Sequence, residues 1–199
     1  MANLEADLVS RARSGDLSAF DELVSLHQDR VFALARRILG NDEDAADVQQ
    51  ETFIRAWRSL PKFRQESEFA TWLHRITVNL CLTRKRSKRE ISADETLFVL
   101  GRMHSAQPTA LDSLERAELL SEIRRALLAL PVHYRVLIVL REMENRSFEE
   151  IAKLLGCSEG GARTRACRAR QMLRQLMRPY LQTGEELPAA DLFEQESQT

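Results

Sequence analysis

Apolar residues recur along this chain at spacings of three and four, the pattern of helices that bury one face. In the first half this pattern is punctuated by capping residues, glycine and proline, and it predicts helices at 4–13, 16–40, 42–60 and 69–86. The third helix is expected to start with Asp42 as its N-cap and to stop before Pro61. With only 7 glycines and 5 prolines in 199 residues, the composition also favours helices over sheet.

The helical pattern lapses between Ile91 and about Leu111, and this stretch is predicted to be a flexible linker. A second series of helices is expected to begin at Asp112, where the sequence DSLE is typical of a capping box. After residue 181 the chain is acidic and aperiodic, which predicts a mobile tail at 182–199. We therefore expect an all-α protein with two small helical domains, at 1–90 and 112–181, joined by a linker at 91–111.

The stretch 147–174 predicts two helices with a tight turn between them, the arrangement of a helix-turn-helix. Ser147 and Glu150 have the spacing of a capping box, and Gly156 follows as a residue that adopts a left-handed C-cap without steric cost. Ser158 is the expected N-cap of the second helix. The second domain is therefore expected to end in a motif typical of DNA-binding proteins.

The second helix of this motif separates small residues from basic ones. Its expected packing face consists of Ala162, Ala166, Ala169 and Leu173. Its opposite face carries Gly160, Thr164, Cys167, Arg168 and Gln171, with Arg163, Arg170 and Arg174 on one flank and Arg165 on the other. Compact or hydrogen-bonding residues toward base edges, with guanidinium groups toward the phosphates, suit a DNA major groove. A solvated basic helix is the alternative, but the coincidence with two caps and a glycine turn favours DNA binding.

Acidic and basic residues are segregated, so the net charge of -1 conceals strong local charge. On the predicted helix 42–60, the expected core face consists of Ala46, Phe53, Trp57 and Leu60. The opposite face carries Asp44, Asp47 and Glu51 and is expected to lie outside. Charge pattern alone favours a solvated face, with Glu51 pairing with Arg55, over a surface that docks another protein.

The predicted helix 69–86 combines an apolar face with a polar stripe that ends in the basic run RKRSKR. Its core face is expected to contain Phe69, Leu73, Ile76 and Leu80, and beside that face lie Trp72, Arg75, Asn79 and Arg86. An aromatic ring, an amide and guanidinium groups in one stripe could stack on and hydrogen-bond an unpaired base. Taken alone, Trp72 is more typical of a core edge. The preceding loop, KFRQESE, carries one aromatic residue that looks exposed, Phe63.

The sequence offers no support for catalysis, a metal site or a cofactor. Three cysteines, at 81, 157 and 167, have neither an even number nor a CxxC spacing, which favours reduced thiols. The four histidines are scattered, and His27 lies within an apolar stripe, so it is expected to be a packed core residue. The longest apolar runs are too short to cross a membrane and no secretory leader pattern is present, which predicts a cytoplasmic protein without direct membrane insertion.

Taken together, these segments resemble the extracytoplasmic-function (ECF) group of bacterial sigma factors, small relatives of sigma-70 that retain only regions 2 and 4. The most specific signal is VQQETFIRAWRSL followed at this distance by ALPVHYRVLIVLRE, and FRQESEFATWLHRITVN and the helix-turn-helix agree with it. The resemblance implies that the acidic helix binds the coiled coil of the largest subunit of core RNA polymerase through Asp47, Gln50 and Glu51. It thereby reverses the preference for a merely solvated face.

The resemblance also implies two sets of promoter contacts. Residues placed at the -10 element are Phe63, Arg64, Trp72, Arg75 and Asn79, where a base is flipped out and the strand is melted. Residues placed at the -35 duplex are Gly160, Gly161, Arg163, Thr164, Arg165, Cys167 and Arg168. The chain departs from the family at Gln65, where a glycine is common, and at Gly161, where threonine is usual. Cys167 occupies a variable specificity position.

These features predict a transcription initiation subunit rather than an enzyme. It would bind core polymerase, with region 4 also reaching the polymerase flap, recognise promoter DNA at two elements and help to open it. The family commonly works under an anti-sigma factor, which would cover the docking surfaces. One alternative is a stand-alone helix-turn-helix regulator whose N-terminal helices dimerise, and another is a helical adaptor that does not bind DNA.

Overall fold

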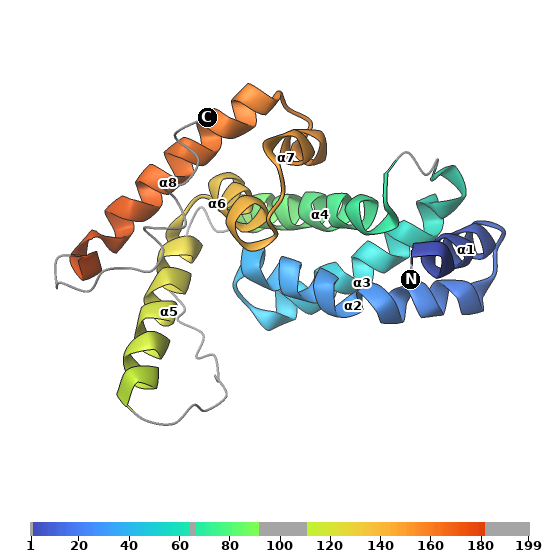
Figure 1. Ribbon diagram of the computed structural model, residues 1–199, viewed down its shortest axis with the longest axis horizontal. Helices are drawn as coiled ribbons and strands as arrows, with labels where there is room; N and C mark the ends of the chain where they lie inside the picture. Colours follow the sequence, from blue (N-terminus) through green and yellow to red (C-terminus); the bar gives the residue numbers. More distant parts are fainter. Residues whose placement is uncertain (1, 64–66, 92–110, 182–199) are drawn as a thin grey trace.

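The computed structural model describes residues 2–63, 67–91 and 111–181, and all regular structure in these ranges is helical (Figure 1). The helices of the first half are α1 (Ala2–Arg13), α2 (Leu17–Leu39), α3 (Asp42–Ser59), the 3-10 turn η1 (Leu60–Lys62) and α4 (Phe69–Ile91). Those of the second half are α5 (Leu111–Ala129), α6 (Val132–Ile138), the π-helical turn η2 (Val139–Met143), α7 (Phe148–Leu155) and α8 (Glu159–Leu181). The all-α prediction is confirmed; the predicted linker and tail lie almost entirely outside the described residues.

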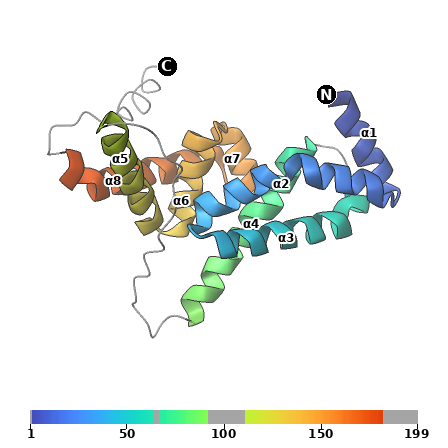
Figure 2. The same cartoon turned by 90° about the horizontal axis from the view of Figure 1, so that it is seen from below.

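The first half is a bundle in which α2, α3 and α4 run side by side and α1 covers one end (Figure 1, Figure 2). Its inner core includes Leu8, Leu23, Leu60 and Leu73, all of which are fully buried. Burying one such side chain contributes about 1.5 to 3 kcal/mol relative to leaving it in water. His27 is buried in the same bundle beside Phe69, as expected, and its Nε2 lies 3.1 Å from Glu5 Oε1.

The start of α3 differs by one residue from the sequence prediction. Asn41, not Asp42, is the N-cap, since Asn41 Oδ1 accepts a hydrogen bond from the backbone N–H of Asp44 at 2.8 Å. Gly40 immediately before it has φ +88°, and this left-handed residue turns the chain so that Asn41 is extended and reaches the first turn. Asp42 is the first helical residue, and its negative charge interacts favourably with the positive end of the helix dipole.

The buried face of α3 also differs from the one predicted, except at Leu60, which is fully buried as expected. The face is lined by the small residues Ala45, Val48, Thr52 and Ala56, whereas Ala46, Phe53 and Trp57 are only partly buried. Both α2 and α4 pack closely on this helix, so its centre accommodates small side chains and its aromatic rings lie at the edge. Thr52 donates its hydroxyl hydrogen to the carbonyl oxygen of Val48 at 2.7 Å, which satisfies the buried polar group.

In the second half α6 packs mainly on α8, and α5 contacts both of these helices (Figure 1). Leu127, Leu130, Ile138 and Ala169 form its local core. Helix α6 begins directly after Pro131 and continues into the π-helical turn η2, and Asn145 follows with φ +50°, in the left-handed region. The capping box predicted at Asp112 concerns side chains outside the described residues.

The two halves share one hydrophobic core. Ile38 and Val78 of the first half are clustered with Val136, Leu140 and Ile151 of the second half, and all five are buried. Gly40 shows how closely the halves approach, because a Cβ atom built on it would collide with the Leu128 side chain. As a result α6 lies against the C-terminal end of α2 and against α4 (Figure 2).

Among the described residues, none of the helices is both long enough and apolar enough to span a membrane. The same part of the chain contains no group of three His, Cys, Asp or Glu side chains arranged to hold a metal ion.

Candidate nucleic-acid interface

The helix-turn-helix at 147–174 is built by local capping, as the sequence predicted. Ser147 Oγ accepts a hydrogen bond from the Glu150 N–H at 3.1 Å, and Glu150 Oε2 accepts one from the Ser147 N–H at 2.8 Å. The backbone hydrogen bond from Ser147 lowers the pKa of Glu150 below its usual value, so this carboxylate is charged at neutral pH. Gly156 then ends α7 in the left-handed conformation, with φ +62°.

The second helix, α8, starts at a serine cap and buries its small residues. Ser158 Oγ accepts from the Gly161 N–H at 3.1 Å, and Ala162, Ala166 and Ala169 are buried. A Cβ atom on Gly161 would lie 3.0 Å from that same hydroxyl oxygen, so the glycine leaves room for the cap. The packing face and both caps were predicted correctly.

The outward face of α8 carries the residues predicted to bind DNA. Gly160, Arg163, Thr164, Arg165, Cys167 and Arg168 are exposed, and Gly161 is half-buried. Thr164 donates its hydroxyl hydrogen to the Gly160 carbonyl oxygen at 2.9 Å. The first half of α8 therefore presents a continuous surface of small and basic side chains, which is chemically suited to a DNA major groove.

Two arginines gather around one aromatic ring beside this surface. The guanidinium carbon of Arg163 lies 4.8 Å from the ring centroid of Phe148, and that of Arg141 lies 5.0 Å from it. Both distances suit cation–π attraction, which restrains two long side chains near each other. Sequence reasoning missed Arg141 because it lies in the π-helical turn η2, outside the periodic pattern of the helix-turn-helix.

Arg170 does not lie on the phosphate-facing flank where the helical wheel placed it. Its Nε and Nη2 atoms donate to Glu142 Oε1 at 3.0 and 2.8 Å, and the side chain is partly buried. This ion pair ties α8 to η2 and gives Arg170 a structural partner 28 residues away. Arg174, predicted on the same flank, is exposed.

The acidic face of α3 is narrower than expected because Asp44 is not part of it. Asp44 is only 2% exposed and accepts hydrogen bonds from Arg84 Nε at 2.6 Å and from Asn41 Nδ2 at 2.8 Å. The guanidinium group of Arg84, on α4, covers this carboxylate, which a helical wheel of α3 alone could not show. Arg84 Nη2 also donates to Asp47 at 2.6 Å.

The remaining acidic surface consists of Asp47, Gln50 and Glu51, of which the first two are exposed and the third is half-buried. Glu51 pairs with Arg55 at 2.6 Å, as predicted. Ile54 continues the same side of the helix and is an exposed apolar residue. A charged surface with an exposed apolar residue beside it is suited to binding another protein.

The -10 residues predicted on α4 follow one exposed edge of that helix. Arg75 and Asn79 are exposed and lie one turn apart, and Trp72 is half-buried at the core edge, as its sequence context indicated. Arg64 lies outside the described residues. The predicted exposure of Phe63 is wrong, because this ring is only 6% exposed and its centroid lies 4.7 Å from that of Trp72. The turn η1 directs Phe63 inward over the start of α4.

Both halves of the chain match known protein families. The family Sigma-70 region 2 matches residues 23–91, and the family Sigma-70, region 4 matches residues 120–173. The ECF RNA polymerase sigma factor SigW of Bacillus subtilis (strain 168) is 33% identical over 177 residues, which cover 85% of this chain and 95% of SigW. The RNA polymerase sigma-H factor of Pseudomonas aeruginosa is 35% identical over 187 residues, 89% of this chain and 95% of that protein.

A solved structure is similar as well. The sigma factor RpoE from Bartonella quintana, crystallised in complex with the anti-sigma factor NepR, superposes with a TM-score of 0.64 at 27% identity. The superposition covers 80% of this chain and 96% of the crystallised one.

Proposed function

Because the chain belongs to the ECF group of sigma-70-type RNA polymerase sigma factors, we propose how its surfaces divide the work of transcription initiation. The chain is an alternative sigma factor: it binds core RNA polymerase, recognises the -10 and -35 promoter elements and promotes opening of the DNA. The single observation that carries the assignment of the DNA-reading surface is the exposed basic face of α8. This helix starts at the Ser158 cap and follows the capped helix α7, both within the region 4 match at residues 120–173 except for the C-terminal end of α8.

The -35 duplex is read by the outward face of α8. The contacting residues are Gly160, Gly161, Arg163, Thr164, Arg165, Cys167 and Arg168. The arginines neutralise phosphates and position the helix, whereas Thr164 and Cys167 lie where base edges are read. Arg141 joins this surface because it shares the Phe148 ring with Arg163.

The -10 element is engaged by the exposed edge of α4. Arg75 and Asn79 hold the melted strand, and Trp72 offers the outer part of its ring to an unstacked base. Phe63 packs against Trp72 and supports it instead of contacting DNA, because the Phe63 ring is buried against the Trp72 ring. Arg64 remains assigned to the strand from the family resemblance alone.

Core polymerase is bound through α3. Asp47, Gln50 and Glu51 face outward beside the apolar Ile54, and this surface docks on the coiled coil of the largest subunit. Region 4 makes a second contact with the polymerase flap. The Bartonella relative was solved with an anti-sigma factor, and we extend that type of partner to this chain, acting in the cytoplasm where polymerase works.

In vitro transcription with core polymerase on a genomic promoter library tests this function. The wild type should initiate at promoters that share a -10 and a -35 sequence. The double variant Asp47→Lys with Glu51→Lys should no longer co-purify with core polymerase. The double variant Arg163→Ala with Arg168→Ala should no longer initiate at these promoters. Asp29→Lys, an exposed acid on α2, is the matched control and should behave like the wild type. Specific DNA binding without polymerase, unaffected by the α3 variants, would favour the stand-alone regulator instead.

A further inference from the structure

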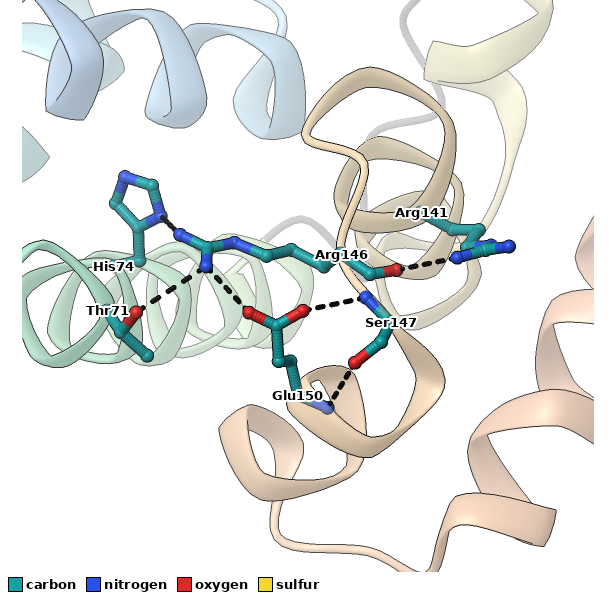
Figure 3. Close-up of polar contacts among 6 residues, drawn as sticks. All are labelled: Thr71, His74, Arg141, Arg146, Ser147 and Glu150. Carbon is teal, nitrogen blue, oxygen red and sulfur yellow. Dashed lines mark hydrogen bonds and ion pairs between the residues drawn. The ribbon is translucent and has the colours of Figure 1, made fainter. Parts of the chain in front are cut away.

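The helix-turn-helix contains three glutamates, Glu149, Glu150 and Glu159. Glu150 has a structural role, because it closes the capping box with Ser147 and binds the guanidinium group of Arg146 at 2.9 Å (Figure 3). Glu149 lies on α7, whereas Glu159 is the first residue of α8. At the start of a helix that binds DNA, a carboxylate is repelled by the phosphate groups. Glu159 is therefore the glutamate whose charge bears on DNA binding.

Glu159 lies beside a basic side chain at the surface. Its Oε1 atom accepts a hydrogen bond from Arg163 Nη2 at 2.8 Å, one turn further along α8. The side chains of Arg163 and Glu159 are 63% and 50% exposed. The same guanidinium group lies over the Phe148 ring. The Glu159 carboxylate is thus accessible from solvent and has a restrained neighbour.

The ion pair leaves both partners able to bind DNA. A carboxylate accepts hydrogen bonds on both of its oxygen atoms, and the contact with Arg163 is made through Oε1. A guanidinium group has several N–H donors, so Arg163 can bind a phosphate while its Nη2 atom stays with Glu159. Arg163 thereby offsets the repulsion between Glu159 and the DNA backbone.

The two residues after Glu159 leave the first turn of α8 open. Gly160 and Gly161 have no side chains, and a Cβ atom built on Gly160 would meet nothing within 4 Å. Glu159 is therefore the only one of residues 159–161 with a side chain that extends beyond the backbone. In a helix-turn-helix the N-terminal residues of the second helix contact base edges. The Glu159 carboxylate is thus placed to meet a base.

The bases differ in what they offer to a carboxylate in the major groove. Cytosine presents its N4 amino group, a donor for which glutamate is a suitable acceptor. Guanine presents N7 and O6 and thymine presents O4, all of which are acceptors and repel a carboxylate. Adenine presents a donor beside an acceptor, which suits an amide better than a carboxylate. A glutamate at this position favours cytosine and also rejects its competitors.

We propose that Glu159 is a specificity-determining residue of the -35 contact and selects a cytosine opposite the start of α8. This inference rests on the proposed function, since it gives Glu159 a partner within the duplex that α8 binds. Arg163 holds the carboxylate and shields it from the phosphates, and Glu159 selects the base. If Glu159 only restrained Arg163, its loss would lower affinity for every -35 sequence alike, because phosphate contacts carry no sequence information.

Selection of promoter fragments by the holoenzyme tests the proposal. Core polymerase with the full-length chain is bound to a library randomised at the -10 and -35 elements, and the bound fragments are sequenced. The wild type should prefer cytosine by about five- to tenfold at one position of the -35 element. Glu159→Gln should shift the preference at that position to adenine, and Glu159→Arg should shift it to guanine. Preferences at the other positions should not change.

Glu149→Gln is the matched control. Glu149 also pairs with a basic residue four positions later, Lys153 at 2.6 Å, but it belongs to α7. This variant should enrich the same sequences as the wild type. Competition binding of single promoters by the holoenzyme gives a second measurement. Glu159→Ala should bind the cytosine promoter about fivefold more weakly than the wild type, and promoters with guanine or thymine at that position at least as tightly, because the repulsion is removed.

Identical base preferences of the wild type, Glu149→Gln and Glu159→Gln would overturn the inference and leave the proposed function intact. An equal loss of affinity for all sequences would also overturn it, and would assign Glu159 to the restraint of Arg163. A wild type that enriches no -35 sequence would refute the proposed function, and base selection by Glu159 with it.

Discussion

At the scale of the residue, the protonation of His74 is controlled by its surroundings. The ring is 6% exposed, and Arg146 contacts one side while His27 and Arg30 of α2 add positive charge nearby. Burial is the largest effect, and it lowers the pKa from 6.5 to about 4. A proton that the unfolded chain binds readily is therefore excluded from the folded one.

This difference predicts a pH dependence of stability. Between pH 6.5 and about 4 the unfolded state binds more protons at His74 than the folded state does. The contribution of neutral His74 to the free energy of unfolding is therefore complete above pH 6.5 and is lost as the pH falls through that window. In this window the free energy of unfolding of the wild type should fall by up to about 1.4 kcal/mol per pH unit because of His74. Urea unfolding at pH 7 to 4.5 should show a smaller slope for His74→Gln and an unchanged slope for His133→Gln, an exposed histidine. Equal slopes would contradict the assignment.

Phe148 positions two arginines by one aromatic face, which leads to a second prediction. Phe148→Leu should lower affinity for -35 duplex DNA by about three- to fivefold, because cation–π attraction contributes about 0.5 to 1 kcal/mol at such sites. Phe148→Tyr, which keeps the ring, should retain affinity. Fluorescence anisotropy of the holoenzyme on labelled promoter DNA measures both. A Leu variant that binds as tightly as the Tyr variant would show that the ring only fills space.

At the scale of the element, α3 shows how a neighbouring helix decides which acidic residues of one helix face are buried. Asp44 and Asp47 are one turn apart and carry the same charge, but only Asp44 is covered, by Arg84 of α4. The two carboxylates therefore have different roles. One holds α3 to α4, and the other faces the solvent from which polymerase approaches.

The paired substitutions Asp44→Asn and Asp47→Asn separate these roles. Asp44→Asn should lower the free energy of unfolding by about 2 kcal/mol, because it weakens charged hydrogen bonds to Arg84 and Asn41 in a buried site. Asp47→Asn should change it by less than about 0.5 kcal/mol and instead weaken core polymerase binding. Chemical denaturation and co-purification with core polymerase measure the two effects. Equal destabilisation by both variants would refute the distinction.

The serine cap of α8 gives an element-scale prediction of its own. Ser158→Ala should destabilise the protein by about 1 kcal/mol because the Gly161 N–H loses its acceptor, whereas Ser158→Asp keeps an acceptor and should remain close to wild type. Thermal unfolding of the three chains provides the comparison. Identical midpoints would mean that water replaces the cap without cost.

At the scale of the whole molecule, a chain with a net charge of -1 concentrates positive charge on one helix face. If Arg163, Arg165 and Arg168 each neutralise one phosphate, raising salt from about 50 to about 200 mM should lower DNA affinity of region 4 by about 40-fold. Arg165→Ala should reduce the slope of log affinity against log salt by about one. Anisotropy titrations at several salt concentrations measure it. A slope unaffected by the substitution would remove Arg165 from the phosphate contacts.

Features that depend on residues close in the chain were determined by the sequence alone. The capping box of Ser147 and Glu150, the Gly156 turn and the alanine face of α8 involve partners within a few positions, and all were predicted correctly. Local hydrogen bonds and helical periodicity decide such features wherever the segment packs. The motif combination was equally sufficient to indicate the family.

Other features were decided only by the tertiary structure, because their partners are distant. Asp44 is covered by Arg84 and Arg170 pairs with Glu142, although single-helix patterns assigned both residues to outer faces. Phe63 is buried against Trp72, although its polar loop sequence indicated exposure. The closed packing of the two halves is the largest example. It depends on residues such as Arg146 that meet their partners more than 70 positions away, and no periodic pattern along the chain encodes that distance.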